Sequence, residues 1–302
     1  MIDPHADKEK RQAAGSSVVA AVALTGTKIA VGLTTGSLGI LAEAAHSGLD
    51  LVAAAMTLFA VRVSGKPADR DHPYGHGKVE NLSALFETVL LLATCVWIIY
   101  SAVERLASGK IEIEVTVWSF AVMALSIVVD VSRSRMLYRV ARKHNSQALE
   151  ADALHFSTDI WSSAVVILGL VCVKLGEWKP SLAVLKSADA VAAVVVAIIV
   201  FYVCGELGVR TIRALLDTAP AGLDGRIAAA AQAVPGVSNC HRVRTRYSGP
   251  QFFVDVHVLV NGNQTLEQAH ALTEAVEEAI REVVPGADVT VHAEPENGDS
   301  NK

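Results

Sequence analysis

The sequence predicts an all-α bundle of six transmembrane helices followed by a small α+β domain. Hydrophobic residues make up 52% of the 302 residues and charged residues only 19%, with a mean hydropathy of +0.39. An ordinary soluble domain has about a quarter of its residues charged. The apolar residues concentrate between Ser16 and Cys204, whereas the C-terminal part has an ordinary soluble composition. We therefore expect two domains.

Six apolar segments are long enough to cross a bilayer, which takes about 20 residues. They are Ser16–Leu33, Gly39–Val61, Leu82–Val103, Val115–Val131, Ala151–Leu175 and Ala188–Cys204. Several of them contain ionisable residues, among them Lys28, His46, Asp50, Glu87, Asp130, His155 and Asp159. Such groups are unfavourable against lipid, so they predict a bundle with a polar interior.

Basic residues gather in alternate connections between these segments. One side has Lys8, Lys10, Arg11, Arg62, Lys66, Arg70, Lys78, Arg133, Arg135, Arg139, Arg142, Lys143, Arg210 and Arg213. The other side has Arg105, Lys110, Lys174, Lys179 and Lys186. Because basic residues stay on the cytoplasmic side of a membrane, this asymmetry predicts that both termini are cytoplasmic.

The C-terminal part alternates between helix-like and strand-like patterns. Leu223–Val234 and Leu266–Val284 read as helices, and Val237–Tyr247, Gln251–Val260 and Asp288–His292 read as strands. This α-β-β-α-β order predicts helices on one face of a small sheet. The expected division is a cytoplasmic tail (1–14), a transmembrane domain (15–208), a linker (209–219), a cytoplasmic domain (220–295) and a disordered polar tail (296–302).

Two apolar segments contain the same spacing of histidine and aspartate, His46 with Asp50 and His155 with Asp159. Residues four apart lie on one face of a helix, about one turn apart. Two such pairs on facing helices would supply two imidazole nitrogens and two carboxylate oxygens, a tetrahedral set suited to zinc. One pair in a soluble helix is usually a surface ion pair, but two pairs in apolar segments favour a shared metal site.

Four protein ligands favour transport over catalysis. A catalytic zinc keeps one position open for water, and the apolar segments contain no His-Glu-x-x-His motif. Metal and protons compete for the same imidazoles, whose unperturbed pKa is about 6.5, and this competition favours proton antiport. A metal sensor without flux and a membrane enzyme are the alternatives.

The net charge of −5 argues against nucleic-acid binding.

Further candidate ligands lie outside the apolar segments. Asp69, His72 and His76 occupy a Gly/Pro-rich loop, which either holds a metal or is a solvated turn. The cysteines suggest neither a disulfide framework nor a thiolate site, because no two are closely spaced: Cys95, Cys172, Cys204 and Cys240.

Another group of histidines lies in the C-terminal domain. His241, His257 and His292 fall on the three predicted strands, with Glu294 close behind the last. One sheet can bring these residues together, so we interpret them as a metal site. His270 is on a predicted helix and is expected to face solvent.

With these residues the chain resembles the cation diffusion facilitator family from about Gly15 to Pro295. The likeness includes the six spans, both His-x-x-x-Asp pairs, Gly75-His76-Gly77-Lys78-Val79-Glu80 and the run from His241 to Pro250. It implies a homodimeric metal–proton antiporter that exports zinc or a related ion across the inner membrane of a bacterium, with lipid, divalent metal ions and protons as partners. It also implies a metallochaperone-like, ferredoxin-like cytoplasmic domain that binds further, regulatory metal at the dimer interface.

The resemblance also implies roles for individual residues. His46, Asp50, His155 and Asp159 match the transport site, and Asp69, His72 and His76 match a loop site. His241, His257, His292 and Glu294 match the cytoplasmic site, His270 matches a neighbouring ion's surroundings, and Lys78 with Asp217 matches a charge pair near the dimer hinge. Well-known bacterial relatives have Asp at position 46, and some members have Asp where this chain has Glu294. The softer imidazole of His46 favours Zn²⁺ over Mn²⁺, with Fe²⁺, Co²⁺, Cd²⁺ and Mn²⁺ as alternative substrates.

Overall fold

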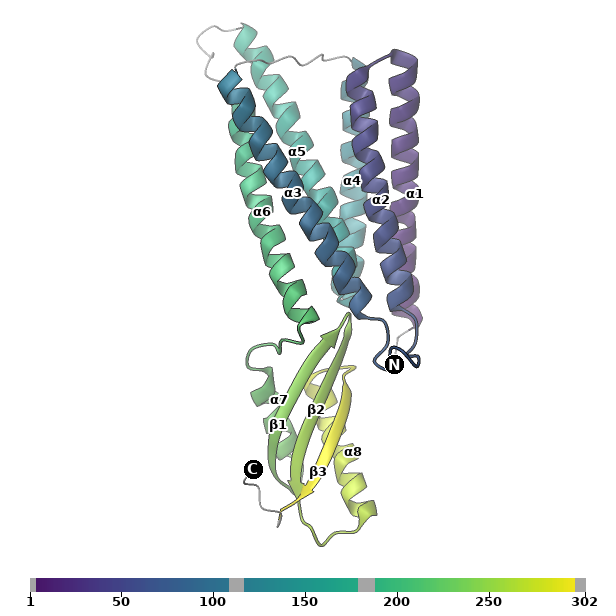
Figure 1. Cartoon of the computed structure of the whole chain (residues 1–302), viewed down its shortest axis with the longest axis vertical. Coiled ribbons are helices and arrows are strands. Elements are labelled where there is room, and N and C mark those ends of the chain that lie inside the picture. Colours follow the sequence, from purple (N-terminus) through teal and green to yellow (C-terminus); the bar gives the residue numbers. More distant parts are fainter. Residues whose placement is uncertain (1–3, 109–116, 179–187, 297–302) are drawn as a thin grey trace. The chain divides into compact units, whose positions relative to one another are not determined.

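The computed structural model describes residues 4–108, 117–178 and 188–296 (Figure 1). Its long helices are α1 (Pro4–Thr35), α2 (Leu38–Ser64), α3 (Lys78–Ser108), α4 (Val117–His144), α5 (Gln147–Trp178) and α6 (Ala188–Leu215). They are followed by α7 (Leu223–Gln232), β1 (Val237–Ser248), β2 (Gln251–Val260), α8 (Leu266–Val283) and β3 (Asp288–Pro295). Pro4–Lys66 and Val79–Ile212 form one compact unit, and Pro67–Lys78 joins the residues from Arg213 onwards in a second.

The helices of the first unit extend beyond the apolar segments. α1 begins at Pro4, so most of the segment expected as a polar tail is helical. α4 continues to His144 and α6 to Leu215, so basic residues expected in a connection, and most of the expected linker, lie on helices. Arg, Lys, Gln and Ala are good helix formers in water and sustain these extensions. Of the tail expected to be disordered, residues 297–302 lie outside the described residues.

Four stretches of the described chain are long and apolar enough to cross a membrane: Pro4–Thr35, Glu43–Ser64, Lys78–Tyr100 and Val194–Leu215. They lie on α1, α2, α3 and α6. Their outer surfaces carry large apolar side chains, with Trp97 69% and Tyr202 73% exposed. Extensive exposed apolar surface marks contact with lipid or another protein. The count of six spans stays a prediction, because α4 and α5 do not meet this criterion over the residues searched.

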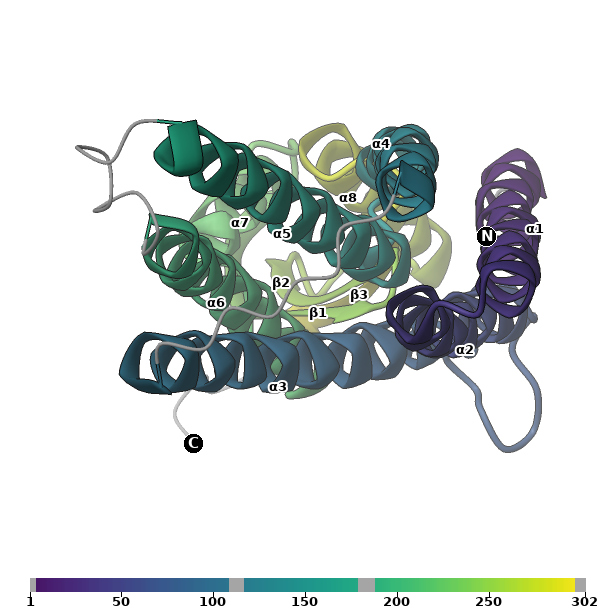
Figure 2. The ribbon, with the colours of Figure 1, turned by 90° about the horizontal axis from the view of Figure 1, so that it is seen from above.

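Two buried clusters hold the bundle together. In one, α1, α2, α4 and α5 meet around Leu137, Leu149 and Phe156. In the other, α3 and α6 pack on α5 around Leu91 and Cys204. Figure 2 shows α5 between α4 and α6, as its membership of both clusters requires. α5 is therefore the helix around which the polar interior is arranged.

The second unit contains a three-stranded sheet in the order β1-β2-β3. β1 and β2 are antiparallel, and α8 connects β2 to the parallel strand β3, which confirms the predicted element order. Alternate residues of β2 such as Val254 and Val256 are buried with Ile227 of α7 and Ile280 of α8. The helices therefore cover one face of the sheet (Figure 1). β3 runs beyond the predicted end at His292 because its pairing with β2 continues to Pro295.

The loop Pro67–Lys78 belongs to this second unit and packs on the hairpin formed by β1 and β2. The ring of Tyr74 meets Phe253 edge-on, with centroids 5.5 Å apart. The guanidinium of Arg246 lies 3.7 Å from the centroid of Tyr74. A cation over an aromatic face is attracted by the ring's quadrupole, so Tyr74 is held from two directions.

Two glycines allow the loop backbone to touch the hairpin turn. A Cβ on Gly77 would collide with the carbonyl oxygen of Ser248, and a Cβ on Gly249 would collide with the carbonyl of Gly77. Gly249 also has a φ of +58°, which favours glycine. Next to this contact, Nζ of Lys78 lies 2.8 Å from Oδ1 of Asp217, so the predicted pair is an ion pair within one chain.

Candidate metal centre

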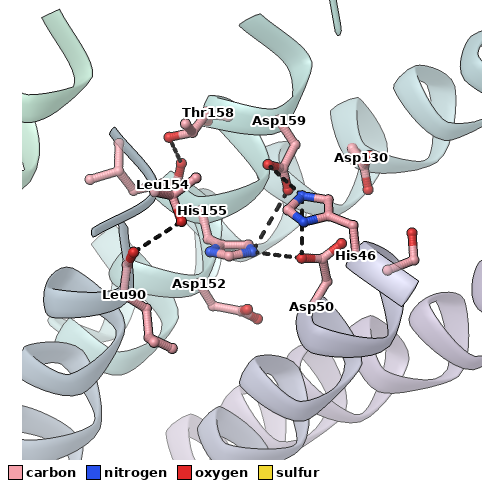
Figure 3. A network of polar contacts seen from close by, with 12 residues as sticks. His46, Asp50, Leu90, Asp130, Asp152, Leu154, His155, Thr158 and Asp159 are labelled. Carbon is pink, nitrogen blue, oxygen red and sulfur yellow. Dashed lines mark hydrogen bonds and ion pairs between the residues drawn. The ribbon is translucent and has the colours of Figure 1, made fainter. Parts of the chain in front are cut away.

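α2 and α5 bring His46, Asp50, His155 and Asp159 together inside the bundle (Figure 3). Nε2 of His155 lies 3.1 Å from Oδ1 of Asp50 and 3.7 Å from Oδ2 of Asp159. Nε2 of His46 lies 4.0 Å from Oδ1 of Asp50 and 3.9 Å from Oδ1 of Asp159. Each carboxylate therefore lies between the two imidazoles, in a ring of alternating nitrogen and oxygen ligands.

The spacing of this ring suits a small tetrahedral cation. Bonds of about 2 Å to such an ion place neighbouring ligand atoms about 3.3 Å apart, close to the 3.1 to 4.0 Å found here. Asp50 and His155 are each 9% exposed, whereas the side chain of His46 is 48% exposed. The ring is thus buried on one side and accessible at His46. The structure brings the four predicted residues together.

Further charged residues surround this ring. Asp130 precedes Arg133 by one turn of α4, and Nη1 of Arg133 lies 3.6 Å from Oδ1 of Asp130. The guanidinium carbon of Arg133 also lies 3.5 Å from the centroid of the Phe156 ring. Nζ of Lys28 on α1 donates to Oγ of Ser47 at 2.7 Å. The sequence identifies Lys28 and Asp130 as charged residues in apolar segments. It does not identify their partners, which are Ser47 of α2 for Lys28 and Arg133 of α4 for Asp130. The sequence predicts that Arg133 lies in a connection, but in the structure it lies on α4 and is buried.

The loop residues Asp69, His72 and His76 form a second group. Oδ1 of Asp69 lies 3.2 Å from Nδ1 of His72, and Oδ2 lies 3.3 Å from Nε2 of His76. The backbone amide of His72 donates to Asp69 and lowers the pKa of this carboxyl below its usual value. The ionised carboxylate and two imidazoles within reach of one point make a three-ligand arrangement.

The third group lies on the face of the sheet opposite α7 and α8. The strand register pairs His241 with His257 and His257 with His292, so the three form one row. Oε1 of Glu294 lies 2.7 Å from Nδ1 of His257, and its Oε2 lies 3.2 Å from Nε2 of His241. The contact with His257 lowers the pKa of Glu294. His270 does not join the row: its side chain is 71% exposed and pairs with Glu274.

Replacing Glu294 by glutamine is expected to weaken metal binding at the sheet by at least about tenfold. The change removes the charged oxygens shared by two histidines and keeps the shape of the side chain. The measurement is a Co²⁺ titration of the full chain followed by absorption, in a background in which Asp50 and Asp69 are both Asn. His270→Ala is the control and should leave the titration unchanged. Equal curves for Glu294→Gln and its parent would contradict the assignment.

Comparison with known protein families covers nearly all of the chain. Residues 16–216 match the cation efflux transmembrane domain, and residues 223–296 match the cytoplasmic domain of cation efflux proteins. The chain is a member of the cation diffusion facilitator family. The resemblance expected from its motifs is confirmed, and the protein is a membrane transporter rather than an enzyme.

Several members of the cation diffusion facilitator family match over most of their length. The cation-efflux pump FieF of Yersinia enterocolitica is 32% identical over 297 residues, which cover 97% of this chain and 95% of that protein. FieF of Salmonella arizonae is 33% identical, covering 94% and 92%. An uncharacterized transporter of Synechocystis is 33% identical, covering 92% and 88%. Among solved structures, the C-terminal domain of MamM is 35% identical, covering 24% of this chain and 94% of that domain, with a TM-score of 0.23.

Proposed function

We propose that this member of the family exports zinc from the cytoplasm in exchange for protons, by alternating access through His46, Asp50, His155 and Asp159. The observation that supports this most directly is the ring of two imidazoles and two carboxylates formed by α2 and α5. Ionisable residues within membrane helices mark substrate or ion pathways. The FieF relatives are cation-efflux pumps, which supports the outward direction of transport.

The donor set favours zinc among the divalent ions. Zinc accepts a tetrahedral mixture of imidazole and carboxylate ligands, whereas manganese and magnesium favour oxygen ligands. Fe²⁺, Co²⁺ and Cd²⁺ accept imidazole too and are the competing substrates. With two carboxylates, a bound Zn²⁺ makes the loaded site electrically neutral, which suits an apolar interior.

Protons and metal use the same atoms of the ring. Metal binding requires neutral imidazoles with free ring nitrogens and ionised carboxylates. Nε2 of His155 lies 3.1 Å from Oδ1 of Asp50, so a proton on this nitrogen would bridge the two side chains and block coordination of metal there. The metal-loaded and proton-loaded states therefore exclude each other, and this exclusion supports antiport.

The other two groups are proposed to be regulatory zinc sites of a homodimer. The loop group lies between α2 and α3, and the row on the sheet leaves His292 64% exposed. An exposed ligand beside a three-residue site is suited to completing the coordination of metal at an interface between two copies. In this proposal the termini are cytoplasmic, the membrane is the inner membrane of a bacterium, and Lys78 with Asp217 lies near the dimer hinge.

The test is metal flux in vesicles that contain the purified full chain. An outward-directed proton gradient is expected to drive zinc uptake, and collapse of the gradient with a protonophore is expected to reduce it. Fe²⁺, Co²⁺, Cd²⁺ and Mn²⁺ compete in parallel assays, and the strongest competitor at equal concentration identifies the preferred ion. Binding without flux would show a sensor, and flux indifferent to the proton gradient would remove the antiport.

Changing His46 to aspartate is expected to shift the selectivity of the site from zinc toward manganese. The substitution replaces an imidazole by a third carboxylate, whose harder oxygens favour Mn²⁺. The ratio of zinc to manganese uptake should fall by about tenfold or more, which corresponds to about 1.4 kcal/mol. Competition flux measures the ratio. His46→Ala is the companion variant: it should lower uptake of both ions, and an equal shift of the ratio in both variants would contradict a role for ligand type.

A further inference from the structure

A row of buried polar side chains runs from the metal ring along α2 and α3, on the side of the ring toward the end of α2. Asp50, Thr57 and Ser64 are seven residues apart on α2 and therefore share one face. Oγ1 of Thr57 donates to Glu87 of α3, and Oγ of Ser64 donates to Glu80 at 2.8 Å. Glu80 and Glu87 are also seven apart. We call Thr57, Ser64, Glu80, Ser83, Glu87 and Asp152 the polar column.

Several atoms in the polar column lack a hydrogen-bond partner. Glu87 and Asp152 are 0% exposed and Ser83 is 2% exposed. Oε2 of Glu87, Oδ1 of Asp152 and Oγ of Ser83 are all unsatisfied, although they are buried. A buried carboxylate oxygen without a partner is strongly unfavourable in an apolar medium. Such groups are rare in membrane helices unless an ion, a proton or water meets them.

These unsatisfied oxygens lie close to the metal ring. Asp152 is one turn before His155 on α5, and Figure 3 shows its carboxylate below the imidazole of His155. Glu87 interacts electrostatically with both Asp152 and His155. Nδ1 of His155, the ring nitrogen that does not face Asp50, is likewise buried without a partner. The polar column therefore extends to the side of the His155 imidazole that faces away from Asp50.

At the end of the polar column farthest from the ring, the ammonium of Lys10 pairs with Glu80. Nζ of Lys10 on α1 lies 2.6 Å from Oε1 of Glu80, and Ser146 donates to the other carboxylate oxygen. Lys10 is 5% exposed and Glu80 is 0% exposed. The lysine ammonium supplies the positive charge beside this buried carboxylate. The same carboxylate ties α1, α2 and the start of α5 to the first turn of α3.

We propose that the polar column is the route by which the metal reaches the ring from the cytoplasm, with Glu87 as a transit ligand and Lys10 on Glu80 as its closed entrance. This inference rests on the proposed export function. Transit requires binding that is favourable enough to enter and weak enough to leave. The described groups of three or more metal-ligating side chains do not include Glu87, so the column offers fewer ligands than the ring, as transit requires.

A purely structural Glu87 is the main alternative. In that case it is a neutral carboxylic acid that accepts a hydrogen bond from Thr57, and replacing it by glutamine would leave the rate of zinc uptake unchanged. A second alternative is a proton carrier that never meets the metal. Glutamine would then remove the effect of the proton gradient but leave zinc uptake without a gradient unchanged.

The test compares full-length Glu87→Gln, Glu87→Asp and Glu104→Gln in vesicles with the cytoplasmic face outward. Glu104 is an exposed glutamate of the same helix, so its change is the matched control. The initial rate of zinc uptake is measured with and without a proton gradient. Equilibrium Co²⁺ binding to the ring is measured on the same proteins in detergent, with Asp69 and Glu294 changed to Asn and Gln to silence the other groups.

The expected result is a loss of about tenfold or more in the uptake rate of Glu87→Gln under both conditions. Its ring affinity should stay within about threefold of the parent, and Glu87→Asp should recover part of the rate because it keeps a carboxylate. Wild-type rates in Glu87→Gln, equal losses of affinity and rate, or a loss confined to the gradient condition would each overturn the proposal. Absent flux in the wild-type chain would instead overturn the proposed function, so the two failures are distinguishable.

Discussion

Vesicles that contain Asp159→Asn are expected to take up zinc at no more than about one hundredth of the wild-type rate. The substitution keeps the shape of the side chain but leaves a bound Zn²⁺ with one negative ligand, so the loaded site carries a net positive charge. An uncompensated charge at the centre of a membrane helix is unfavourable by about 2.5 to 3.5 kcal/mol, and about 2.7 kcal/mol is a hundredfold in occupancy. Asp50→Asn should behave alike, because Asp50 also contacts both imidazoles.

Binding and flux together show whether this loss arises at the ring. Calorimetric titration of the detergent-solubilised variants should show the loss of one zinc equivalent, while binding at the loop and at the sheet persists. Glu104→Gln serves again as the exposed control and should transport normally. Substantial flux through Asp159→Asn would mean that the metal crosses the bundle by a path that avoids the ring.

A second large effect is expected from Lys10→Met, this time on stability. Methionine fills a similar volume but leaves Glu80 as a buried charge without its cation, 2.6 Å away in the intact pair. Removing one partner of a buried ion pair destabilises proteins by about 3 to 5 kcal/mol. For a domain of this size that is a fall of roughly 10 °C in the apparent melting temperature. Thermal unfolding in detergent, monitored by circular dichroism, measures it.

The neighbouring ion pair supplies the control for this prediction. Lys143 pairs with Glu9, the residue before Lys10, but both side chains are largely exposed, so Lys143→Met should have little effect on melting. The double variant Lys10→Met with Glu80→Gln should recover part of the loss, because neither charge then remains unpaired. Equal melting of Lys10→Met and Lys143→Met would show that the burial of the pair contributes nothing to stability.

The ring of four ligands was predictable from sequence because two local rules suffice to find it. Hydropathy places His46 and His155 in apolar segments, and a four-residue spacing places each aspartate on the same helix face as its histidine. The row on the sheet followed in the same way, since strand alternation sets which residues share a face. No such rule places His270 with the other three histidines, and in the structure it lies on an exposed part of α8.

The charges at the end of the polar column could not be found by local rules. Lys10 and Glu80 are 70 residues apart, and each lies in a polar segment outside the predicted spans, where charges are ordinary. Only the packing of α1, α2 and α3 turns two unremarkable residues into a buried pair. Asp152 lies at the start of the predicted fifth span, but no local spacing rule connects it with its partner Ser17 on α1. The sequence identifies Glu87 as a charge in an apolar segment, but it does not identify Thr57 as its hydrogen-bond partner.

The docking of the loop Pro67–Lys78 on the β1–β2 hairpin has a practical consequence for biochemical work on this transporter. A fragment starting at Arg213 contains every element of the sheet unit except this loop, and therefore lacks Tyr74. Phe253 would lose its edge-on ring, and Arg246 would lose the closer of its two aromatic partners. An excised fragment would thus present a bare aromatic and cationic surface to solvent. Self-association or ligand binding at that surface would report the excision rather than the intact protein.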